Sequence, residues 1–117
     1  MTTSVETTTA TTTVQTVRGP VAADRLGTVL MHEHIFVLDK EMRRNYPEMW
    51  DEETVVAEAV TKLNALAARG VSTVVDPTVV GLGRDVARVA RVNERVDLNI
   101  VVATGLYTLA DVPLLFR

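Results

Sequence analysis

Cysteine is absent from the 117-residue sequence, so neither a disulfide framework nor a thiolate metal site can form. Aromatic residues make up only 4% of it, which leaves no stacking platform for single-stranded nucleic acid. Fifteen acidic residues outnumber twelve basic ones, and a net charge of −3 argues against binding to a phosphate backbone. No apolar run approaches the roughly 20 residues that span a bilayer. We therefore expect a cytoplasmic protein that binds neither nucleic acid nor membranes.

The first sixteen residues differ in composition from the rest of the chain. Residues 1–16 are mostly threonine and lack the basic and apolar segments of a targeting signal. Such a segment buries little apolar surface, which predicts a disordered tail. The whole chain is 47% apolar and 23% charged, and residues 17–117 are expected to form a single domain.

Short apolar segments alternate with amphipathic ones after the tail. Turn residues at Gly19-Pro20 and near Asp24 predict a short hairpin. Hydrophobic patterning then predicts strands and helices in alternation, at 28–31 (strand), 52–69 (helix), 71–75 (strand), 84–96 (helix) and 98–102 (strand). Asp51 is the expected N-cap of the first helix, and Gly70 is its expected stop. This order predicts an α/β fold with a parallel sheet covered on both faces.

Two further segments have a plain structural interpretation. We expect a loop from 39 to 50, because Pro47 cannot occupy a helix interior. The second predicted helix carries a row of arginines on or near the side away from its valines, namely Arg84, Arg88, Arg91 and Arg95. We interpret that row as a solvated helix face.

The sequence contains only two histidines, His32 and His34, and both follow the first predicted strand. Side chains two residues apart on a strand share a face, so two imidazoles there can reach one metal ion. The carboxyl end of a strand is also where α/β folds bind ligands. The spacing alone leaves two interpretations open: a metal site, or two histidines satisfied by hydrogen bonds.

Two other polar residues follow the later strands. Asp76 precedes a proline, and this pair commonly initiates a turn, which is our interpretation of it. Tyr107 follows the third predicted strand, from where its side chain could reach the same mouth as the histidines. The alternative for Tyr107 is an ordinary half-buried tyrosine.

Four segments, in order, resemble the phosphotriesterase family of the amidohydrolase superfamily. They are 27–34 (GTVLMHEH), 70–78 (GVSTVVDPT), 83–85 (GRD) and 103–107 (ATGLY). The resemblance is greatest to the phosphotriesterase-like lactonases. It implies that residues 17–117 form the N-terminal portion of a (β/α)8 TIM barrel, with about three strands and two helices after a short hairpin.

The resemblance also implies a metal-dependent hydrolase. His32 and His34 would hold the more buried ion of a binuclear centre, and Tyr107 would lie beside the metals as a catalytic residue. The implied cofactor is a divalent metal, zinc in the first place, with iron, cobalt or nickel open. The family's bridging hydroxide attacks a lactone carbonyl or the phosphorus of an organophosphate triester. The expected partner is thus a small-molecule ester or lactone, and the full-length protein could form a homodimer.

The family's remaining ligands, a carboxylated lysine, two histidines and an aspartate, belong to later strands. We therefore expect little or no hydrolysis and only weak metal binding by these 117 residues alone. Two alternatives stay open: a small non-catalytic α/β module of flavodoxin-like type that binds a partner or an anion, and an inactive truncated product. Such a module would unfold cooperatively by itself, whereas an incomplete barrel would aggregate or need its missing strands.

Overall fold

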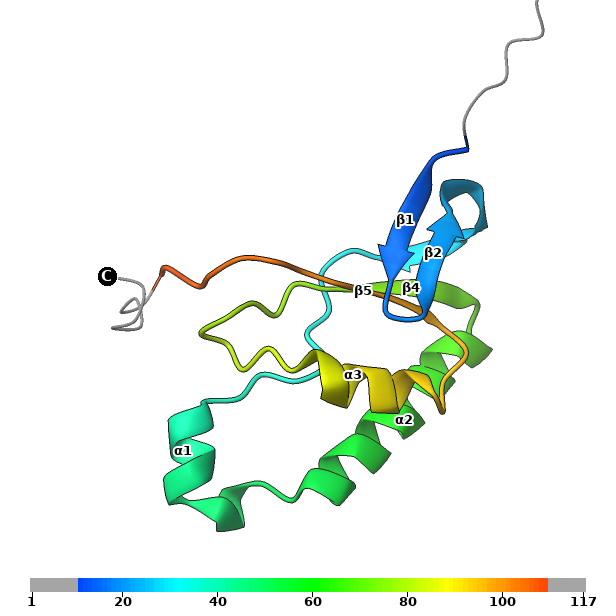
Figure 1. Cartoon of the computed structure of the whole chain (residues 1–117). Coiled ribbons are helices and arrows are strands. Elements are labelled where there is room, and N and C mark those ends of the chain that lie inside the picture. Colours follow the sequence, from blue (N-terminus) through cyan, green and yellow to red (C-terminus); the bar gives the residue numbers. More distant parts are fainter. Residues whose placement is uncertain (1–10, 110–117) are drawn as a thin grey trace, which may run out of the picture.

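The computed structural model describes residues 11–109, which form a hairpin followed by a small α/β unit (Figure 1). Strands β1 (Thr13–Thr16) and β2 (Gly19–Ala22) pair antiparallel. Within the described residues, a parallel sheet has the order β3 (Thr28–Leu30), β4 (Val71–Asp76) and β5 (Asn99–Val102). The α-helices of this part are α1 (Lys40–Asn45), α2 (Glu52–Ala68) and α3 (Val86–Asn93), with 3₁₀ turns η1 (Ala23–Arg25) and η2 (Pro47–Met49). The predicted alternation of strands and helices is confirmed.

The hairpin turn lies at residues 17–18, so the prediction of a turn at Gly19-Pro20 is wrong, and both of these residues belong to β2. β1 begins at Thr13, so the expectation of a disordered tail is wrong for residues 13–16, while residues 1–10 of that tail lie outside the described residues. Val14 is paired with Val21, and the buried Thr16 hydroxyl donates to the Gly19 carbonyl at 2.7 Å. Threonine suits a strand once a partner strand satisfies its backbone, and composition alone does not reveal that partner.

Helix α2 follows its local sequence signals closely. The Asp51 carboxylate accepts a hydrogen bond from the Thr54 amide at 3.1 Å, which caps the first turn. The helix ends at Ala68, and Gly70 follows with a φ of +92°, a conformation that favours glycine. The predicted start, cap and stop of this helix are therefore confirmed.

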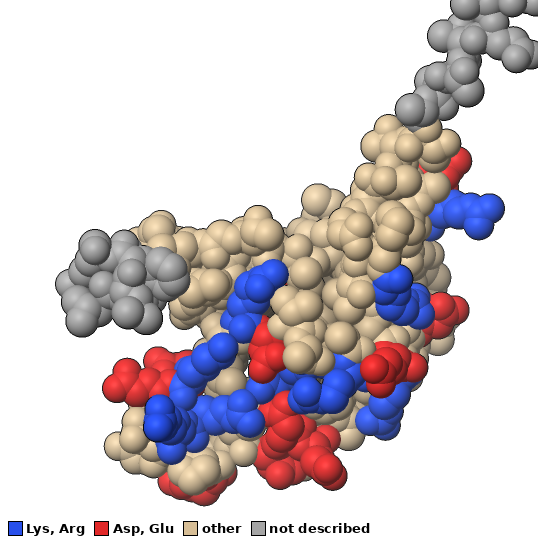
Figure 2. Space-filling model, viewed as in Figure 1, with Lys and Arg blue, Asp and Glu red and all other residues tan. Residues whose placement is uncertain are grey.

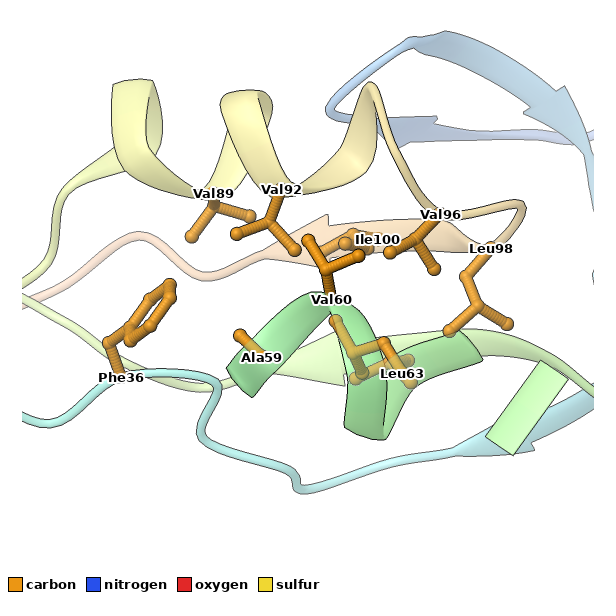
Figure 3. Close-up of a cluster of buried hydrophobic side chains, with 10 residues drawn as sticks. Phe36, Ala59, Val60, Leu63, Val89, Val92, Val96, Leu98 and Ile100 are labelled. Carbon is orange, nitrogen blue, oxygen red and sulfur yellow. The ribbon is translucent and has the colours of Figure 1, made fainter. Parts of the chain in front are cut away.

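The core lies between the sheet and helices α2 and α3 (Figure 3). Leu63 of α2 and Val92 of α3 point into the same cluster, and Ile100 of β5 is fully buried beside them. In the described part of the chain both helices pack together on one side of the sheet, so the expectation of helices on both faces is wrong there (Figure 1). This matches a barrel wall, whose helices form only the outer layer.

The segment between β3 and α2 contains a helix that the sequence analysis missed. Asp39 caps α1 by accepting a hydrogen bond from the Met42 amide at 2.9 Å. Helix α1 ends at Asn45, and Pro47 then begins η2. Proline is compatible with a first helical turn, so Pro47 excludes a helix interior only at its own position.

The expected solvated face of arginines is wrong at Arg88 and also at Arg84, which precedes α3, is half-buried and donates from Nε to the Ala103 carbonyl at 2.8 Å. Arg88 is 1% exposed, and its guanidinium lies over the rings of Phe36 and Trp50, 5.6 and 5.1 Å from their centroids. Arg91 is exposed, as predicted. The aromatic rings and an acidic partner that surround Arg88 come from distant segments, and helical periodicity carries no information about them.

Charged side chains of both signs are interspersed over the helices, while the strands beside them show a largely uncharged surface in the same view (Figure 2). In the part of the chain that the structure describes, no helix has the length and apolar character that crossing a membrane requires.

Candidate metal centre at the carboxyl edge of the sheet

Parallel strands bring their carboxyl ends to one edge of the sheet, and the predicted site residues follow those ends. Figure 1 shows the segments that follow β4 and β5 leaving the sheet on the same side. Backbone hydrogen bonds stabilise this edge. The Glu33 amide donates to the Val75 carbonyl at 3.0 Å, and the Ala103 amide donates to the Asp76 carbonyl at 3.1 Å. The segments that follow β3 and β5 are thereby tied to the carboxyl end of β4.

The two imidazoles lie side by side at this edge. The ring centroids of His32 and His34 are 5.1 Å apart, with the ring planes at 83°. β3 ends at Leu30, so both histidines occupy the bend after the strand and not the strand itself. The predicted proximity is confirmed, although the strand periodicity that suggested it does not extend to these residues.

His34 is anchored through one of its ring nitrogens. Its Nδ1 atom lies 2.9 Å from the Thr78 hydroxyl oxygen, and 30% of its side chain is exposed. His32 is exposed as well. The other nitrogen of His34, Nε2, is the one that a metal ion could use.

Asp76 organises the end of β4. Its carboxylate, in a residue only 2% exposed, accepts hydrogen bonds from the Thr78 amide at 2.9 Å and from the Ile35 amide at 3.4 Å. It also contacts the Thr78 hydroxyl. The turn interpretation of Asp76 is confirmed, and the same carboxylate reaches across to the segment that carries the histidines.

Thr78 is the site residue that the sequence analysis missed. Its side chain joins Asp76 to His34, and the residue is 5% exposed. A signal exists in the sequence, because a threonine two residues after a turn-forming aspartate places both its amide and its hydroxyl near that carboxylate. The contact with His34, by contrast, depends on the pairing of β3 with β4.

Tyr107 is fixed to the segment after β4. Its backbone amide donates to the Val80 carbonyl at 2.8 Å, and the residue is half-buried. Among the described residues no hydrogen bond joins Tyr107 to either histidine. Tyr107 thus follows β5, on the predicted side of the sheet, and its catalytic role stays a prediction.

The donor set suits part of a transition-metal site. Two neutral imidazoles fit zinc, iron, cobalt or nickel, and a catalytic zinc ion normally has three protein ligands. Within residues 11–109 no group of three histidine or acidic side chains is close enough to hold a metal ion. His32 and His34 therefore fit as two ligands of a centre that requires further donors.

Comparisons with known proteins extend the resemblance along nearly the whole chain. Residues 12–117 match the phosphotriesterase family model. A protein of Mycobacterium tuberculosis named phosphotriesterase homology protein is 55% identical over 105 residues, which cover 89% of this chain and 32% of that protein. An aryldialkylphosphatase of Saccharolobus solfataricus is 36% identical over 91 residues, covering 78% of this chain and 29% of that protein. These matches confirm the resemblance seen in the sequence.

Solved structures agree with the sequence matches. The phosphotriesterase from Mycobacterium tuberculosis superposes with a TM-score of 0.86 and 54% identity, over 90% of this chain and 33% of the other. A doubly substituted organophosphorus hydrolase from Deinococcus radiodurans gives a TM-score of 0.75 and 40% identity, over 81% and 29% of the two chains. The chain spans about a third of the length of these relatives, and it corresponds to the N-terminal portion of their TIM barrels.

Proposed function

The chain belongs to the phosphotriesterase family, and on that basis we propose that the complete protein is a metal-dependent hydrolase of lactones or organophosphate triesters. The TIM-barrel architecture contradicts the flavodoxin-like alternative, because the matching solved structures contain this α/β unit as part of a barrel wall. Active sites of such barrels lie at the carboxyl ends of the strands.

One observation carries the proposal: the two imidazoles meet at that edge. His32 and His34 lie 5.1 Å apart by ring centroid, in the bend that follows β3. The described contacts of His34 engage only Nδ1, and both imidazoles are solvent-accessible, so Nε2 of His34 is open to a ligand. The pair is therefore available to a metal ion.

The chain's own residues have separate tasks in this proposal. His32 and His34 bind one ion of a metal pair, and Tyr107 contacts the substrate beside it. When bound, the metal pair supplies Lewis acidity, which makes water nucleophilic at neutral pH and stabilises charge on the substrate oxygen. Asp76 holds the end of β4 next to the segment that carries the histidines, because its carboxylate accepts a hydrogen bond from the Ile35 amide.

The proposal includes two substrate classes, lactones and phosphate triesters, and a different observation favours each. The tyrosine at position 107 resembles the lactonase branch and favours lactones. The archaeal relative named aryldialkylphosphatase favours phosphate triesters. Both substrates place a polarised oxygen next to an electrophilic centre, so one metal site could serve both.

The test is a hydrolysis assay of the complete gene product loaded with zinc. A γ-lactone and an aryl dialkyl phosphate are compared for the unaltered protein, His32→Gln and His34→Gln. We expect turnover of at least one substrate and a loss of roughly 100-fold or more in each histidine variant, because a ligand is removed. Lys62→Gln, at an exposed position on α2, is the matched control and keeps full activity. Undiminished turnover by both histidine variants would contradict the proposal.

A further inference from the structure

Three side chains form a continuous polar row from the interior of the sheet to the histidine pair. Asp76 is 2% exposed and Thr78 is 5% exposed, while the side chain of His34 is 30% exposed. The Asp76 carboxylate contacts the Thr78 hydroxyl, whose oxygen lies 2.9 Å from Nδ1 of His34. The row begins at a buried carboxylate and ends at an accessible imidazole.

The positions of Asp76 and Thr78 are fixed by backbone groups. The Thr78 amide donates to one carboxylate oxygen of Asp76 at 2.9 Å, and the Ile35 amide donates to the other at 3.4 Å. Ile35 directly follows His34, so the same carboxylate positions both Thr78 and the chain beside the imidazole. Neither side chain can turn away without leaving a buried polar group unpaired.

The hydrogen-bond donors and acceptors in this row determine which ring nitrogen of His34 carries the proton. Thr78 has one hydroxyl proton, and its neighbours include the Asp76 carboxylate and the Phe36 carbonyl at 3.4 Å, both of which only accept. The hydroxyl therefore donates to one of these oxygens and has only lone pairs left for His34. The hydrogen bond at Nδ1 then requires the imidazole to donate, so its proton is on Nδ1 and the lone pair is on Nε2.

We propose that Asp76 and Thr78 are positioning residues that hold His34 in the Nδ1–H tautomer and present its Nε2 lone pair to the metal. This inference rests on the proposed function for the identity of what Nε2 binds. It assigns to Asp76 and Thr78 a role beyond turn formation. It also distinguishes the two histidines, since among the described residues no side-chain hydrogen bond orients His32.

The experiment uses the complete gene product with Thr78→Val, which removes the hydroxyl but keeps the branched shape, and Thr78→Ser, which keeps the hydroxyl. Zinc affinity is measured by competition with a chromophoric chelator, and the imidazole tautomer by nitrogen-15 NMR of the metal-free protein at about pH 8. We expect Thr78→Val to lower zinc affinity 10- to 100-fold, as loss of a partner behind a metal ligand typically does. The same variant should give mixed tautomers at His34, and Thr78→Ser should stay close to the unaltered protein in both measurements.

The NMR measurement separates this inference from the proposed function. A single Nδ1–H tautomer of His34 in the unaltered protein supports the row even if Thr78→Val does not fold. An Nε2–H tautomer there, or unchanged affinity and tautomer in a folded Thr78→Val variant, would overturn it. If the unaltered protein binds no zinc, the proposed function fails, while the tautomer still decides whether the row exists.

Discussion

The guanidinium of Arg88 holds the Glu52 carboxylate with two hydrogen bonds, from Nε to Oε1 at 2.8 Å and from Nη2 to Oε2 at 3.2 Å. Trp50 donates to the same carboxylate at 2.7 Å, and Arg91 does so at 2.6 Å. Glu52 begins α2 and Arg88 lies within α3, so the pair joins the two helices where the segment from β3 enters α2. We infer that this junction stabilises the packing of α2 against α3 and the segment that carries Phe36 and Trp50.

Arg88→Met should destabilise the protein far more than Arg91→Met. Arg88 is 1% exposed, and its loss removes both bonds to Glu52, which we expect to cost about 2 kcal/mol of unfolding free energy. Methionine keeps much of the packing between Phe36 and Trp50, which isolates the polar contribution. The side chain of Arg91 is 53% exposed, and its pairing is worth less than about 1 kcal/mol. Urea unfolding of both variants measures the difference, and equal costs would refute the ranking.

Stability should depend on pH through Glu52. The hydrogen bond from Arg88 chiefly lowers the pKa of Glu52 from its ordinary 4.5 to about 2, against the opposing effect of burial. Between these values the unfolded chain binds more protons than the folded one, so the stabilisation is complete above pH 4.5 and is lost as the pH falls toward 2. We expect the unfolding free energy of Glu52→Gln to fall less steeply than that of the unaltered protein in this window. Glu58→Gln, at an exposed position on α2, should keep the original slope, and parallel curves for Glu52→Gln and the unaltered protein would contradict the assignment.

Gly83→Ala should cost more stability than Gly19→Ala, although both glycines have positive φ. A Cβ at Gly83, with φ +90°, would lie 2.9 Å from the Leu38 amide nitrogen, whereas a Cβ at Gly19, with φ +115°, meets nothing within 4 Å. We expect Gly19→Ala to cost about 1 kcal/mol for the backbone alone. Gly83→Ala should add about 1–3 kcal/mol, because the histidine-bearing segment must move away. Thermal unfolding compares the two, and indistinguishable transitions would show that the contact with Leu38 is unimportant.

The parts of the fold that could be predicted are those whose signals are local. Asp51 and Gly70 mark the two ends of α2 in the sequence itself, and the apolar run that became β4 needs no distant partner to be recognised. Helix α1 was missed because Pro47 was taken to exclude a helix throughout 39–50, whereas it excludes a helix interior only at its own position. The burial of Arg88 could not be predicted, because its ion-pair partner Glu52 is 36 positions away in the sequence.

In the candidate site, too, features with local sequence signals could be predicted and features that depend on distant residues could not. The spacing of His32 and His34 predicts that their rings lie together, but it does so through a strand geometry that ends at Leu30, and the family resemblance gives the pair its chemical meaning. The contact of Thr78 with His34 joins residues 44 positions apart, and only the parallel pairing of β3 with β4 creates it. The role of Tyr107 stays a prediction, since its described contacts are with the segment after β4.

The most direct test of the account is an anomalous difference map from crystals of the complete gene product grown with zinc. We expect a peak at about 2.0–2.1 Å from Nε2 of His34 and from a ring nitrogen of His32, the distance of a zinc–imidazole bond. Ordered imidazoles with no shared peak, or a zinc ion bound only by other residues, would contradict the claim that this pair forms part of the metal centre.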